Sequence, residues 1–461
     1  MTDSLREKKV FIATFGCQMN EYDSDVVFRL LSERGWSRTR EIGQADFIFL
    51  NTCSIREKAE QKVYSYLGRL RPLKEARPDL VIGVGGCVAQ QEGEKLLEAA
   101  PFVDLVLGTH GVRRLPDLLE EAARTRQAVC YTGFDYETGR TPVPVPEGAG
   151  LKAFLTIMQG CDNFCAYCVV PYVRGREISR PPGDILAEAG GLLAGGVKEI
   201  TLLGQNVNSY GRGLEPAADF VDLLERMAGL PGLLRLRFTT SHPKDLSPRL
   251  MRAMAEIGPL CEHLHLPVQA GSSAVLSAMG RGYSREEYLA RVEALREARP
   301  GVALTTDVIV GFPGETEADF QETMSLVEQV RFDGMFSFKY SDRPNTRAAG
   351  LPGKVDEAVK GRRLSELQAR QKEISASRNR EMVGRRVEVL VEGRSGRYDG
   401  QLTGRTRGNK IVNFTGPSGL IGGLAEPLVV EAWANSLRGI LPEAENAAGA
   451  APLTSRAAAD S

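Results

Sequence analysis

The chain has 461 residues, eight cysteines and a formal net charge of −1. Its length predicts about three domains, and 42% hydrophobic with 25% charged residues is typical of a globular protein. A near-neutral chain excludes attraction to nucleic acid through overall charge, so any such surface must be local. The N-terminus is polar and no apolar run is long enough to cross a bilayer, so we expect a cytoplasmic protein without a membrane partner.

Residues 1–148 alternate short apolar runs with helical patterns. We expect helices near 19–34, 56–71, 90–99 and 113–125, and strands at Val10–Ala13, Phe47–Leu50, Leu80–Val84 and Val103–Leu107. This order predicts an open parallel α/β sheet with right-handed crossovers. The Pro-rich residues 141–149 predict a linker, which places the first domain boundary near residue 148.

Three cysteines follow the first three of these strands. They are Cys17, Cys53 and Cys87. The carboxyl ends of parallel strands share one edge of a sheet, so we expect the three thiols to be neighbours in space. The functional interpretation is a three-cysteine metal site with one open position. The alternative is a coincidence of three structural cysteines, since lone cysteines are often simply buried.

A second group of cysteines, Cys161, Cys165 and Cys168, has CxxxCxxC spacing. Thiolates this close on a short loop can converge on one metal centre. The spacing favours a 4Fe–4S cluster in which one iron has no cysteine ligand. A zinc site with a distant fourth ligand, or a disulfide with a spare thiol, remains an alternative.

Residues 149–380 contain six further strand-like runs. These are Phe154–Met158, Glu199–Leu203, Leu234–Thr239, His263–Pro267, Ala303–Val310 and Gly334–Tyr340, with helices expected at 183–194, 217–229, 246–256, 285–298 and 317–330. Six consecutive βα units predict a partial (β/α)6 barrel whose active groups line the carboxyl ends of the strands. The CxxxCxxC loop follows the first of these strands.

Polar side chains gather where the later strands end. They include Gln205 and Asn206, the run Thr239–Pro243, His265 and Gln269, and Asp307 and Gly311. By strand alternation His263 and His265 share a face, where they either bind substrate or pack as satisfied polar groups. We expect the two remaining cysteines, Cys130 and Cys261, to be buried structural thiols.

Residues 381–441 change to short alternating strands separated by Gly-rich turns. Strands are expected at Val387–Glu392, Tyr398–Thr403, Lys410–Phe414 and Leu428–Ala432, and they predict a small antiparallel β-barrel. Residues 354–410 contain 15 Lys or Arg and 8 Asp or Glu. That local surplus is either a phosphate-binding surface or a solvated charged face. Residues 442–461 are expected to be a disordered tail.

The CxxxCxxC loop after a strand resembles the radical S-adenosylmethionine (SAM) enzymes. The resemblance implies that Cys161, Cys165 and Cys168 are catalytic and hold a 4Fe–4S cluster. In that superfamily the open iron binds SAM, which is cleaved to a 5′-deoxyadenosyl radical. It also implies a set of SAM-binding residues at the strand ends, which are Gln205, Asn206, His265, Gln269, Asp307 and Gly311. The C-terminal segment is similar to the TRAM domain, an RNA-binding barrel.

The order of the three domains resembles the radical SAM methylthiotransferases, which replace a C–H bond by C–S–CH₃. That family implies a second, auxiliary 4Fe–4S cluster on Cys17, Cys53 and Cys87, which supplies or carries the sulfur. Four segments resemble the branch that acts on isopentenyl-adenosine in tRNA: Cys168–Pro181, Leu203–Asn208, Arg237–Pro243 and Gly404–Gly416. The implied reaction is methylthiolation of C2 of N(6)-dimethylallyl(isopentenyl)adenosine at position 37 of the anticodon loop.

The resemblance also implies the partners of a monomeric enzyme: tRNA, an electron donor such as flavodoxin or ferredoxin, and a sulfur source. Other branches act on threonylcarbamoyl-adenosine in tRNA or on a ribosomal-protein aspartate, so both substrates stay open. A non-catalytic iron–sulfur RNA-binding redox sensor is the alternative from another class. Arg174, Arg176 and Arg180 follow the cysteine loop and either meet RNA or form salt bridges at the barrel rim.

Overall fold

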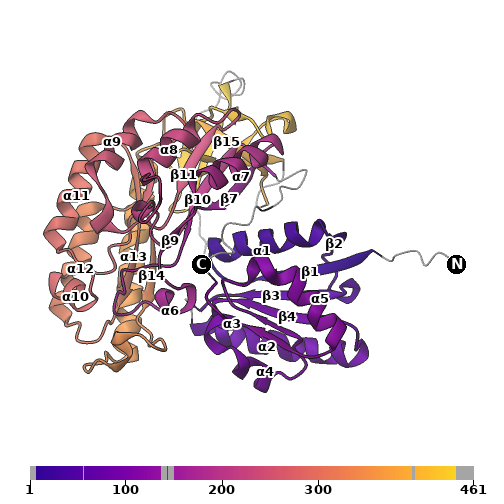
Figure 1. Cartoon of the computed structure of the whole chain (residues 1–461). Helices are drawn as coiled ribbons and strands as arrows, with labels where there is room; N and C mark the ends of the chain where they lie inside the picture. The colour runs from indigo at the N-terminus through magenta and orange to yellow at the C-terminus, as the bar shows by residue number, and fades with distance from the viewer. Residues whose placement is uncertain (1–6, 55–56, 136–142, 144–149, 397–399, 443–461) are drawn as a thin grey trace.

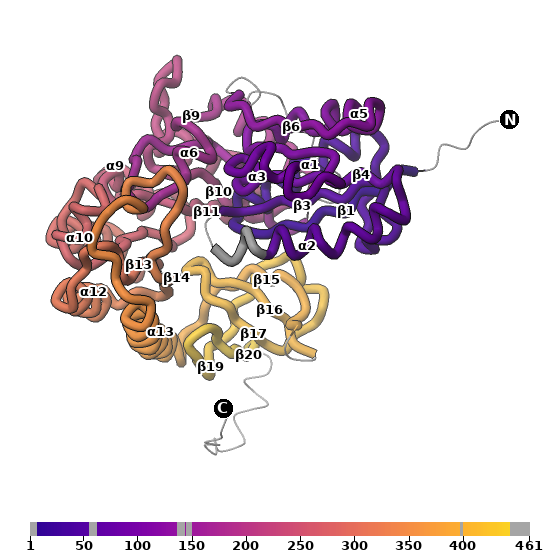
Figure 2. The backbone as a smooth tube through the Cα atoms, turned by 90° about the horizontal axis from the view of Figure 1, so that it is seen from below, coloured from indigo at the N-terminus to yellow at the C-terminus, as the bar shows by residue number. Residues whose placement is uncertain are grey.

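The computed structural model describes residues 7–54, 57–135, 143, 150–396 and 400–442. Most of the predicted linker at 141–149, part of the strand expected at 398–403, and all but the first residue of the expected tail lie outside these residues. Three units follow one another along the chain: an α/β domain, a partial barrel and a small curled sheet (Figures 1 and 2). Within the described residues no helix combines the length and apolar character that crossing a membrane requires.

The first unit is the parallel sheet that the sequence predicts, with two additional edge strands. Its order is β2-β1-β3-β4-β5-β6, and every neighbouring pair is parallel. The strands are β1 (Lys8–Thr14), β2 (Trp36–Arg38), β3 (Phe47–Thr52), β4 (Val81–Gly86), β5 (Leu105–Leu107) and β6 (Val129–Tyr131). The central strands β3 and β4 are buried along their whole length, as expected for a sheet covered on both faces.

Two layers of helices cover this sheet (Figure 1). One hydrophobic cluster packs α1 (Gln18–Ser32) and α5 (Leu115–Thr125) against one face. The other face packs against α2 (Glu57–Ala76), α3 (Cys87–Glu92) and α4 (Glu94–Ala99). The single helix expected at 90–99 is therefore two helices, because the chain breaks at Gly93, whose φ is +53°.

The second unit contains six parallel barrel strands in two three-stranded sheets, ordered β11-β10-β7 and β12-β13-β14. An isolated parallel bridge between Leu236 and Leu260 connects the two sheets. The strands are β7 (Lys152–Thr156), β10 (Glu199–Leu203), β11 (Arg235–Phe238), β12 (His263–His265), β13 (Ala303–Val310) and β14 (Gly334–Lys339). A separate two-stranded ribbon of β8 (Met158–Gln159) and β9 (Ile178–Ser179) flanks the cysteine loop.

Helices alternate with these strands, and all except the short α6, which packs against the first unit, form the outer layer of the barrel (Figure 1). They are α6 (Val170–Arg174), α7 (Pro182–Ala194), α8 (Phe220–Ala228), α9 (Pro248–Glu256), α10 (Ser273–Ala278), α11 (Arg285–Ala298), α12 (Glu317–Val330) and α13 (Glu357–Arg380). Local capping explains several starts: Asp219, Ser284 and Thr316 each form a reciprocal capping box. The partial barrel predicted from six βα units is thus present.

The third unit is a curled six-stranded sheet of order β18-β15-β16-β17-β20-β19. Its strands are β15 (Val389–Arg394), β16 (Gln401–Thr406), β17 (Ile411–Thr415), β18 (Leu424–Ala425), β19 (Leu428–Ala432) and β20 (Leu437–Ile440). All pairs are antiparallel except β17 with β20, which is parallel. The sheet is therefore mixed rather than purely antiparallel, because β18 and β19 are inserted between these two strands along the chain.

The curled sheet contacts residues at the amino ends of the barrel strands. Arg235, at the start of β11, donates to the Arg405 carbonyl over 2.6 Å and to Glu388 over 2.8 Å. Arg237 donates to the carbonyls of Thr406 and Arg407, both over 2.8 Å. The opposite, carboxyl ends of the strands are left to the cysteine loop and the N-terminal domain.

Candidate iron–sulfur and SAM site

The three N-terminal cysteines lie at the carboxyl edge of the sheet, as the sequence predicts. Cys17 precedes α1, Cys53 follows β3, and Cys87 begins α3. A hydrogen bond with Cys53 lowers the pKa of the Cys17 thiol to about 6. Burial raises the pKa of Cys87, and the nearby Cys17 raises it further. These three thiols are therefore close enough to interact.

Local packing explains why the first two of these cysteines approach each other. A Cβ on Gly16 would lie 2.5 Å from the Cβ of Cys53, at a φ of +149°, so only glycine fits there. The buried amide of Asn20 donates to Asn51 Oδ1 over 2.8 Å. The amide of Asn51 donates back to the Asn20 carbonyl, also over 2.8 Å. The start of α1 is thereby fixed to the end of β3.

The second cysteine group lies on the loop between β8 and α6. Burial raises the pKa of Cys161 to about 11 and that of Cys168 to about 12, and in both cases the neighbouring Cys165 contributes. The Cys168 backbone N–H donates to the Cys165 carbonyl over 3.0 Å, so the loop is tightly turned. These three thiols are also neighbours.

One short helix, α6, connects the two groups. It begins two residues after Cys168, and Val169 and Val173 pack with Cys87 in one buried cluster. The Val173 carbonyl accepts from Thr109 over 2.7 Å, and the Arg174 carbonyl contacts His110 Nε2 over 3.0 Å. The barrel group therefore leads directly into α6, and Cys87 of the N-terminal group packs against that segment at Val169 and Val173.

A buried arginine lies beside each group. Arg281 Nη1 is 3.4 Å from Cys165 Sγ, and its Nη2 donates to the Pro267 carbonyl over 2.7 Å. Arg174, at the end of α6, forms a 2.9 Å ion pair with Asp23 and acts electrostatically on Cys17 and Cys87. A positive charge near a thiol favours its thiolate, which is the form that binds metal.

The chemistry of both groups fits iron, since thiolates are the usual ligands of iron–sulfur clusters. Among the described residues no group of three or more His, Cys, Asp or Glu side chains stands in a metal-binding arrangement. The two ligand sets stay predictions, and the free thiols show no disulfide among the described cysteines.

Several buried polar atoms at the strand ends have no hydrogen-bond partner among the described residues. They are Gln205 Oε1, Ser241 Oγ and His242 Nε2. Burial, with the charge of Arg281 as a further cause, lowers the pKa of His242 to about 2, so its ring is neutral. Unpaired buried polar atoms are costly unless a ligand satisfies them. This feature fits a polar ligand such as SAM beside the Cys161 loop.

The predicted SAM-binding residues occupy three different settings. Asn206 is fully buried, and its amide bonds Asp245 over 2.7 Å and the His242 N–H over 3.1 Å, so it holds neighbouring loops together. Gln269 has a φ of +75° and pairs with Val308 near the end of β13. Gly311 donates to Glu315 just beyond that strand.

The other two predicted residues, His265 and Asp307, lie lower on the barrel wall. His265 Nε2 is 3.4 Å from Asp307 Oδ1, and its Nδ1 is 3.0 Å from Thr305 Oγ1. His263 Nε2 contacts the same Thr305 hydroxyl over 3.2 Å. Both histidines are hydrogen-bonded within the wall, and burial lowers the pKa of His263 to about 3.

The arginines that follow the cysteine loop separate into two kinds. Arg174 pairs with Asp23, and Arg180 pairs with the buried Glu188 over 2.8 Å. Arg176 has an exposed side chain and pairs with Asp162 over 2.6 Å. All three form ion pairs, which favours the salt-bridge interpretation for this segment.

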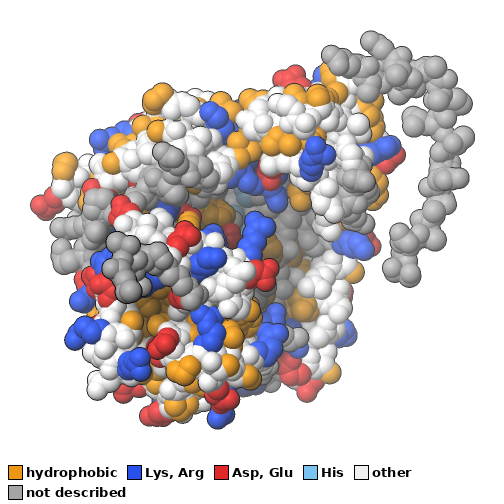
Figure 3. All heavy atoms as spheres, turned by 90° about the vertical axis from the view of Figure 1, so that its right-hand side faces the viewer, with side chains coloured by type: hydrophobic (Ala, Val, Ile, Leu, Met, Phe, Trp, Pro, Cys, Tyr) orange, Lys and Arg blue, Asp and Glu red, His pale blue; other side chains and the backbone are white. Residues whose placement is uncertain are grey.

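The basic surplus of residues 354–410 is largely paired with acids of the barrel. Arg363 pairs with Glu315, Arg407 with Glu262, and Lys410 with Asp333, each over 2.8 Å. Arg362, Arg370 and Arg378 also pair with acids outside the stretch. Many of these basic side chains therefore form contacts between the C-terminal stretch and the barrel, and do not only face solvent. Lys and Arg side chains nevertheless border the hollow visible in Figure 3.

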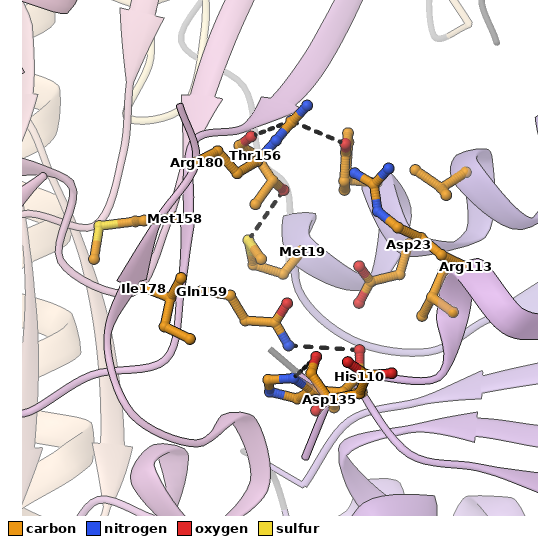
Figure 4. Close-up of a pocket in the computed structure, with 14 residues that line it drawn as sticks. Met19, Asp23, His110, Arg113, Asp135, Thr156, Met158, Gln159, Ile178 and Arg180 are labelled. Carbon is orange, nitrogen blue, oxygen red and sulfur yellow. Dashed lines mark hydrogen bonds between the residues drawn. The ribbon is translucent and has the colours of Figure 1, made fainter. Parts of the chain in front are cut away.

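A partly open cavity of about 80 Å³ lies between the N-terminal domain and the barrel (Figure 4). Its lining includes Met19, Asp23, His110, Arg113 and Gln159. Liquid water occupies about 30 Å³ per molecule, so this cavity has room for a few waters and not for a nucleoside.

Cys261 is buried, as predicted, and Cys130 is only half-buried on β6. Sequence reasoning did not identify Arg281 or single out Ser241 and His242. Arg281 stands between Gly280 and Gly282, both at positive φ. The two flanking glycines are the one local feature that could have pointed to Arg281. Its contact with Cys165 has no local signal, because the two residues are 116 positions apart.

Three regions of the chain match known domains. Residues 9–108 match uncharacterized protein family UPF0004, residues 155–327 match the radical SAM superfamily, and residues 380–441 match the TRAM domain. The fold is similar to the radical SAM methyltransferase TsrM from Kitasatospora setae, whose structure contains cobalamin and a 4Fe–4S cluster. That match has a TM-score of 0.56 and 16% identity, and it covers 74% of this chain and 77% of the other. The protein is thus a radical SAM enzyme, a class whose members use a 4Fe–4S cluster and SAM.

Curated relatives define the family more narrowly. The tRNA-2-methylthio-N(6)-dimethylallyladenosine synthase of Geobacter sulfurreducens is 52% identical, over 94% of this chain and 97% of the relative. Enzymes of the same name from Syntrophobacter fumaroxidans and Moorella thermoacetica are 52% and 48% identical, each over 94% of this chain. The chain belongs to this family of radical SAM methylthiotransferases.

Proposed function

We propose that this protein methylthiolates C2 of N(6)-dimethylallyladenosine at position 37 of tRNA, replacing C2–H by C2–S–CH₃. The observation that carries the proposal is that the two cysteine groups meet at one short segment: Cys168 precedes α6, and Cys87 packs with Val169 and Val173. One group belongs to the barrel and has the CxxxCxxC spacing of radical SAM enzymes. The other belongs to the N-terminal domain, so electron transfer and sulfur delivery have separate sites close to one substrate.

The barrel cysteines Cys161, Cys165 and Cys168 would hold one 4Fe–4S cluster, and Cys17, Cys53 and Cys87 a second. When bound, the first cluster supplies the electron that cleaves SAM, and the second supplies or carries the sulfur. The protein's part is to hold the reactants and set their charges, since the cofactors carry the difficult chemistry. Arg281, next to Cys165, offers a charge-assisted hydrogen bond to sulfur there.

SAM would lie at the strand ends beside the Cys161 loop. Gln205, Ser241 and His242 bring unpaired buried polar atoms to that region. Gln269 and Gly311 lie at the ends of their strands, while the buried, bonded Asn206 would act by positioning its neighbours. His265 and Asp307 were predicted for the same ligand, and they face the lumen further from these ends.

The tRNA would approach as a loop with the modified base turned outward, because a base in a stack cannot reach a barrel interior. The match of residues 380–441 to the TRAM domain supports an RNA partner. Two further partners follow from the balance of the reaction: an electron donor, such as flavodoxin or ferredoxin, and a sulfur source. We also propose a cytoplasmic monomer with domains at 1–148, 149–380 and 381–441, followed by a tail at 442–461.

The decisive experiment is anaerobic. The protein is reconstituted with iron and sulfide, reduced, and incubated with SAM and a tRNA that carries dimethylallyladenosine, and the digested nucleosides are analysed by mass spectrometry. We expect that nucleoside to gain one methylthio group. 5′-Deoxyadenosine without this product would overturn the substrate and direct attention to threonylcarbamoyl-adenosine or a ribosomal-protein aspartate. The absence of both products would favour an iron–sulfur RNA-binding redox sensor.

A further inference from the structure

One wall of the barrel lumen presents an ordered set of side chains. The registers Thr305–Gly334, Asp307–Phe336 and Ile309–Phe338 place three rows across β13 and β14. The alternate residues Leu304, Thr306, Val308 and Val310 are buried, so they face the outer helices. Thr305, Asp307 and Ile309 therefore face the lumen, together with their partners on β14.

Phe336 is the unusual member of this wall. It is 60% exposed, although it lies in the middle of a barrel strand and not on a loop. Its ring meets the edge of the His265 ring at a centroid separation of 6.3 Å and an interplanar angle of 72°. On a wall that is otherwise half-buried, this exposed ring offers a stacking surface for a flat ligand.

An acceptor lies directly beside this platform. Asp307, the register partner of Phe336, has a carboxylate that is 27% exposed and contacts His265 Nε2. The chain of contacts from His263 through Thr305 to His265 holds that imidazole in place. A fixed imidazole in turn orients the carboxylate, so Asp307 presents a hydrogen-bond acceptor at the edge of the ring.

The next row toward the strand ends is apolar. Ile309 and Phe338 are register partners there, and both are only half-buried. From the amino to the carboxyl end of the strands, the first row is polar. The second row has an aromatic ring with a hydrogen-bond acceptor, and the third has an aliphatic and an aromatic side chain. A ligand that matches this order has a flat ring, an edge N–H donor and a branched apolar substituent.

We infer that this wall binds the substrate base, a purine with an alkyl group on its exocyclic nitrogen. Phe336 stacks on the ring, Asp307 accepts the single N6–H, and Ile309 with Phe338 contacts the branched alkyl chain. The inference rests on the proposed function, because that function supplies the N6-dimethylallyl adenine. It assigns His265 and Asp307 to the substrate rather than to SAM, which stays at the strand ends with Gln205 and His242.

This arrangement accounts for selectivity as well as binding. Unmodified adenosine could stack on Phe336 and donate to Asp307, but it would leave the apolar row in contact with water. Stacking of the base on an aromatic ring favours both RNAs, and burial of the alkyl chain favours only the alkylated one. Phe336 contributes to both, since it borders the ring and the alkyl chain.

The test compares two anticodon stem-loop RNAs of one sequence, with adenosine or N6-dimethylallyladenosine at the target position. Binding to the reconstituted full-length protein is measured by fluorescence anisotropy in the presence of SAM. We expect Phe336→Ala to reduce the preference for the alkylated RNA about tenfold and Phe336→Trp to retain it. Trp433→Ala is the matched control, because that aromatic is 45% exposed on the C-terminal sheet and its loss must leave the preference unchanged.

A second variant distinguishes the two ligands. Asp307→Asn should weaken binding of the alkylated RNA while SAM binding and 5′-deoxyadenosine formation stay within twofold of the wild type. If Asp307→Asn instead abolishes SAM binding and spares the RNA preference, or if Phe336→Ala leaves that preference intact, the inference is wrong. The proposed function would survive both results provided that the wild-type enzyme still forms the methylthio product, so the two failures are distinct.

Discussion

At the scale of single residues, the pKa of Cys17 distinguishes it from the thiols of the barrel group. Cys17 shares a hydrogen bond with Cys53 that lowers its pKa to about 6, whereas burial raises the pKa of Cys161 to about 11. The N-terminal group thus contains one thiol that is ready to bind metal at neutral pH. Cys161 and Cys168 must lose their protons as metal binds, and Arg281 lies beside the third thiol of their group, Cys165.

This difference predicts a pH-dependent reactivity in the metal-free protein. The thiolate is the nucleophile, so a thiol with a lowered pKa reacts at lower pH. Cys17 should become reactive toward iodoacetamide as the pH rises through about 6, while Cys161 and Cys168, with pKa values of about 11 and 12, stay protonated. Peptide mass mapping at a series of pH values gives the order. Equal labelling of Cys17 and Cys168 near pH 7 would contradict it.

A second residue-scale prediction concerns the separate tasks of the groups. Cys161→Ala, Cys165→Ala or Cys168→Ala should abolish 5′-deoxyadenosine formation, because each removes a ligand of the cluster next to SAM. Cys17→Ala, Cys53→Ala or Cys87→Ala should preserve SAM cleavage and stop methylthio transfer. Chromatography of deoxyadenosine, alongside nucleoside mass spectrometry, measures both. Cys261→Ala is the control, since this buried thiol lies outside both groups. Equal loss of deoxyadenosine in the two sets would refute the separation.

The sequence was sufficient to predict which cysteines gather, because strand ends and short spacings are local features. It did not identify Arg281, and it named Arg174 without its partner. Arg281 reaches Cys165 from 116 positions away, and Arg174 meets Asp23 from 151 positions away. The predicted ligand Asn206 shows the converse: its polar type suggested a contact with SAM, yet its amide is bonded within the protein. The partners of a polar side chain depend on packing that no local pattern encodes.

At the scale of elements, the loop that carries Cys161 depends on a close backbone approach. Gly160 has a φ of +78°, and a Cβ there would lie 1.9 Å from the Arg176 carbonyl oxygen. Both the strained φ and the clash with rigid backbone oppose any side chain. The cysteine loop can therefore approach the backbone at Arg176 this closely only because Gly160 has no Cβ.

Gly160→Ala should displace this loop. We expect the free energy of unfolding to fall by about 3 kcal/mol or more, and the iron bound after reconstitution to fall by about half, since one of two groups is disturbed. Gly196→Ala is the matched control, because its φ is +100° with no atom within 4 Å of the added Cβ. That control should cost only about 1 kcal/mol and retain its iron. Denaturant unfolding and iron analysis measure the two quantities, and similar results for both variants would disprove the clash.

Most elements could be predicted because apolar strands and helical periods repeat in order. The strands missed in the first domain, β2 and β6, have three residues each and lie at the sheet edges. Such short runs carry too few residues to show a period. The parallel pairing of β17 with β20 was also missed, since pairing direction depends on how the chain crosses the sheet.

At the scale of the whole molecule, buried arginines hold the third unit against the barrel. Arg235 is fully buried, and its guanidinium bonds only groups of the C-terminal sheet among its described contacts. Net charge and composition do not predict these domain contacts. By composition alone, the basic surplus of residues 354–410 could equally face solvent. The ion pairs with Glu262, Asp333 and Glu315 instead direct much of it inward.

Arg235→Met should therefore loosen the third unit. The change leaves the Arg405 carbonyl and Glu388 without their donor, which should cost about 2–4 kcal/mol. We expect calorimetry of the variant to show an early transition for the C-terminal sheet, separate from the barrel. Arg438→Met is the control: its partner Glu431 lies in the same sheet and both are exposed, so the loss should be below about 1 kcal/mol. A single unshifted transition for Arg235→Met would refute the coupling.

The contact between the first domain and the barrel is fixed in a similar way. Glu188, on α7, bonds Arg180 of the barrel over 2.8 Å, and both Arg29 and Tyr22 of α1 over 3.3 Å. A buried charge with this many partners is costly to expose, so the two domains should not part during turnover. We therefore expect the RNA, and not the arrangement of the two domains, to change conformation on binding. An anticodon loop that a covalent crosslink makes rigid should therefore not be a substrate. A flexible loop can turn its base outward into an enzyme whose two domains stay in place.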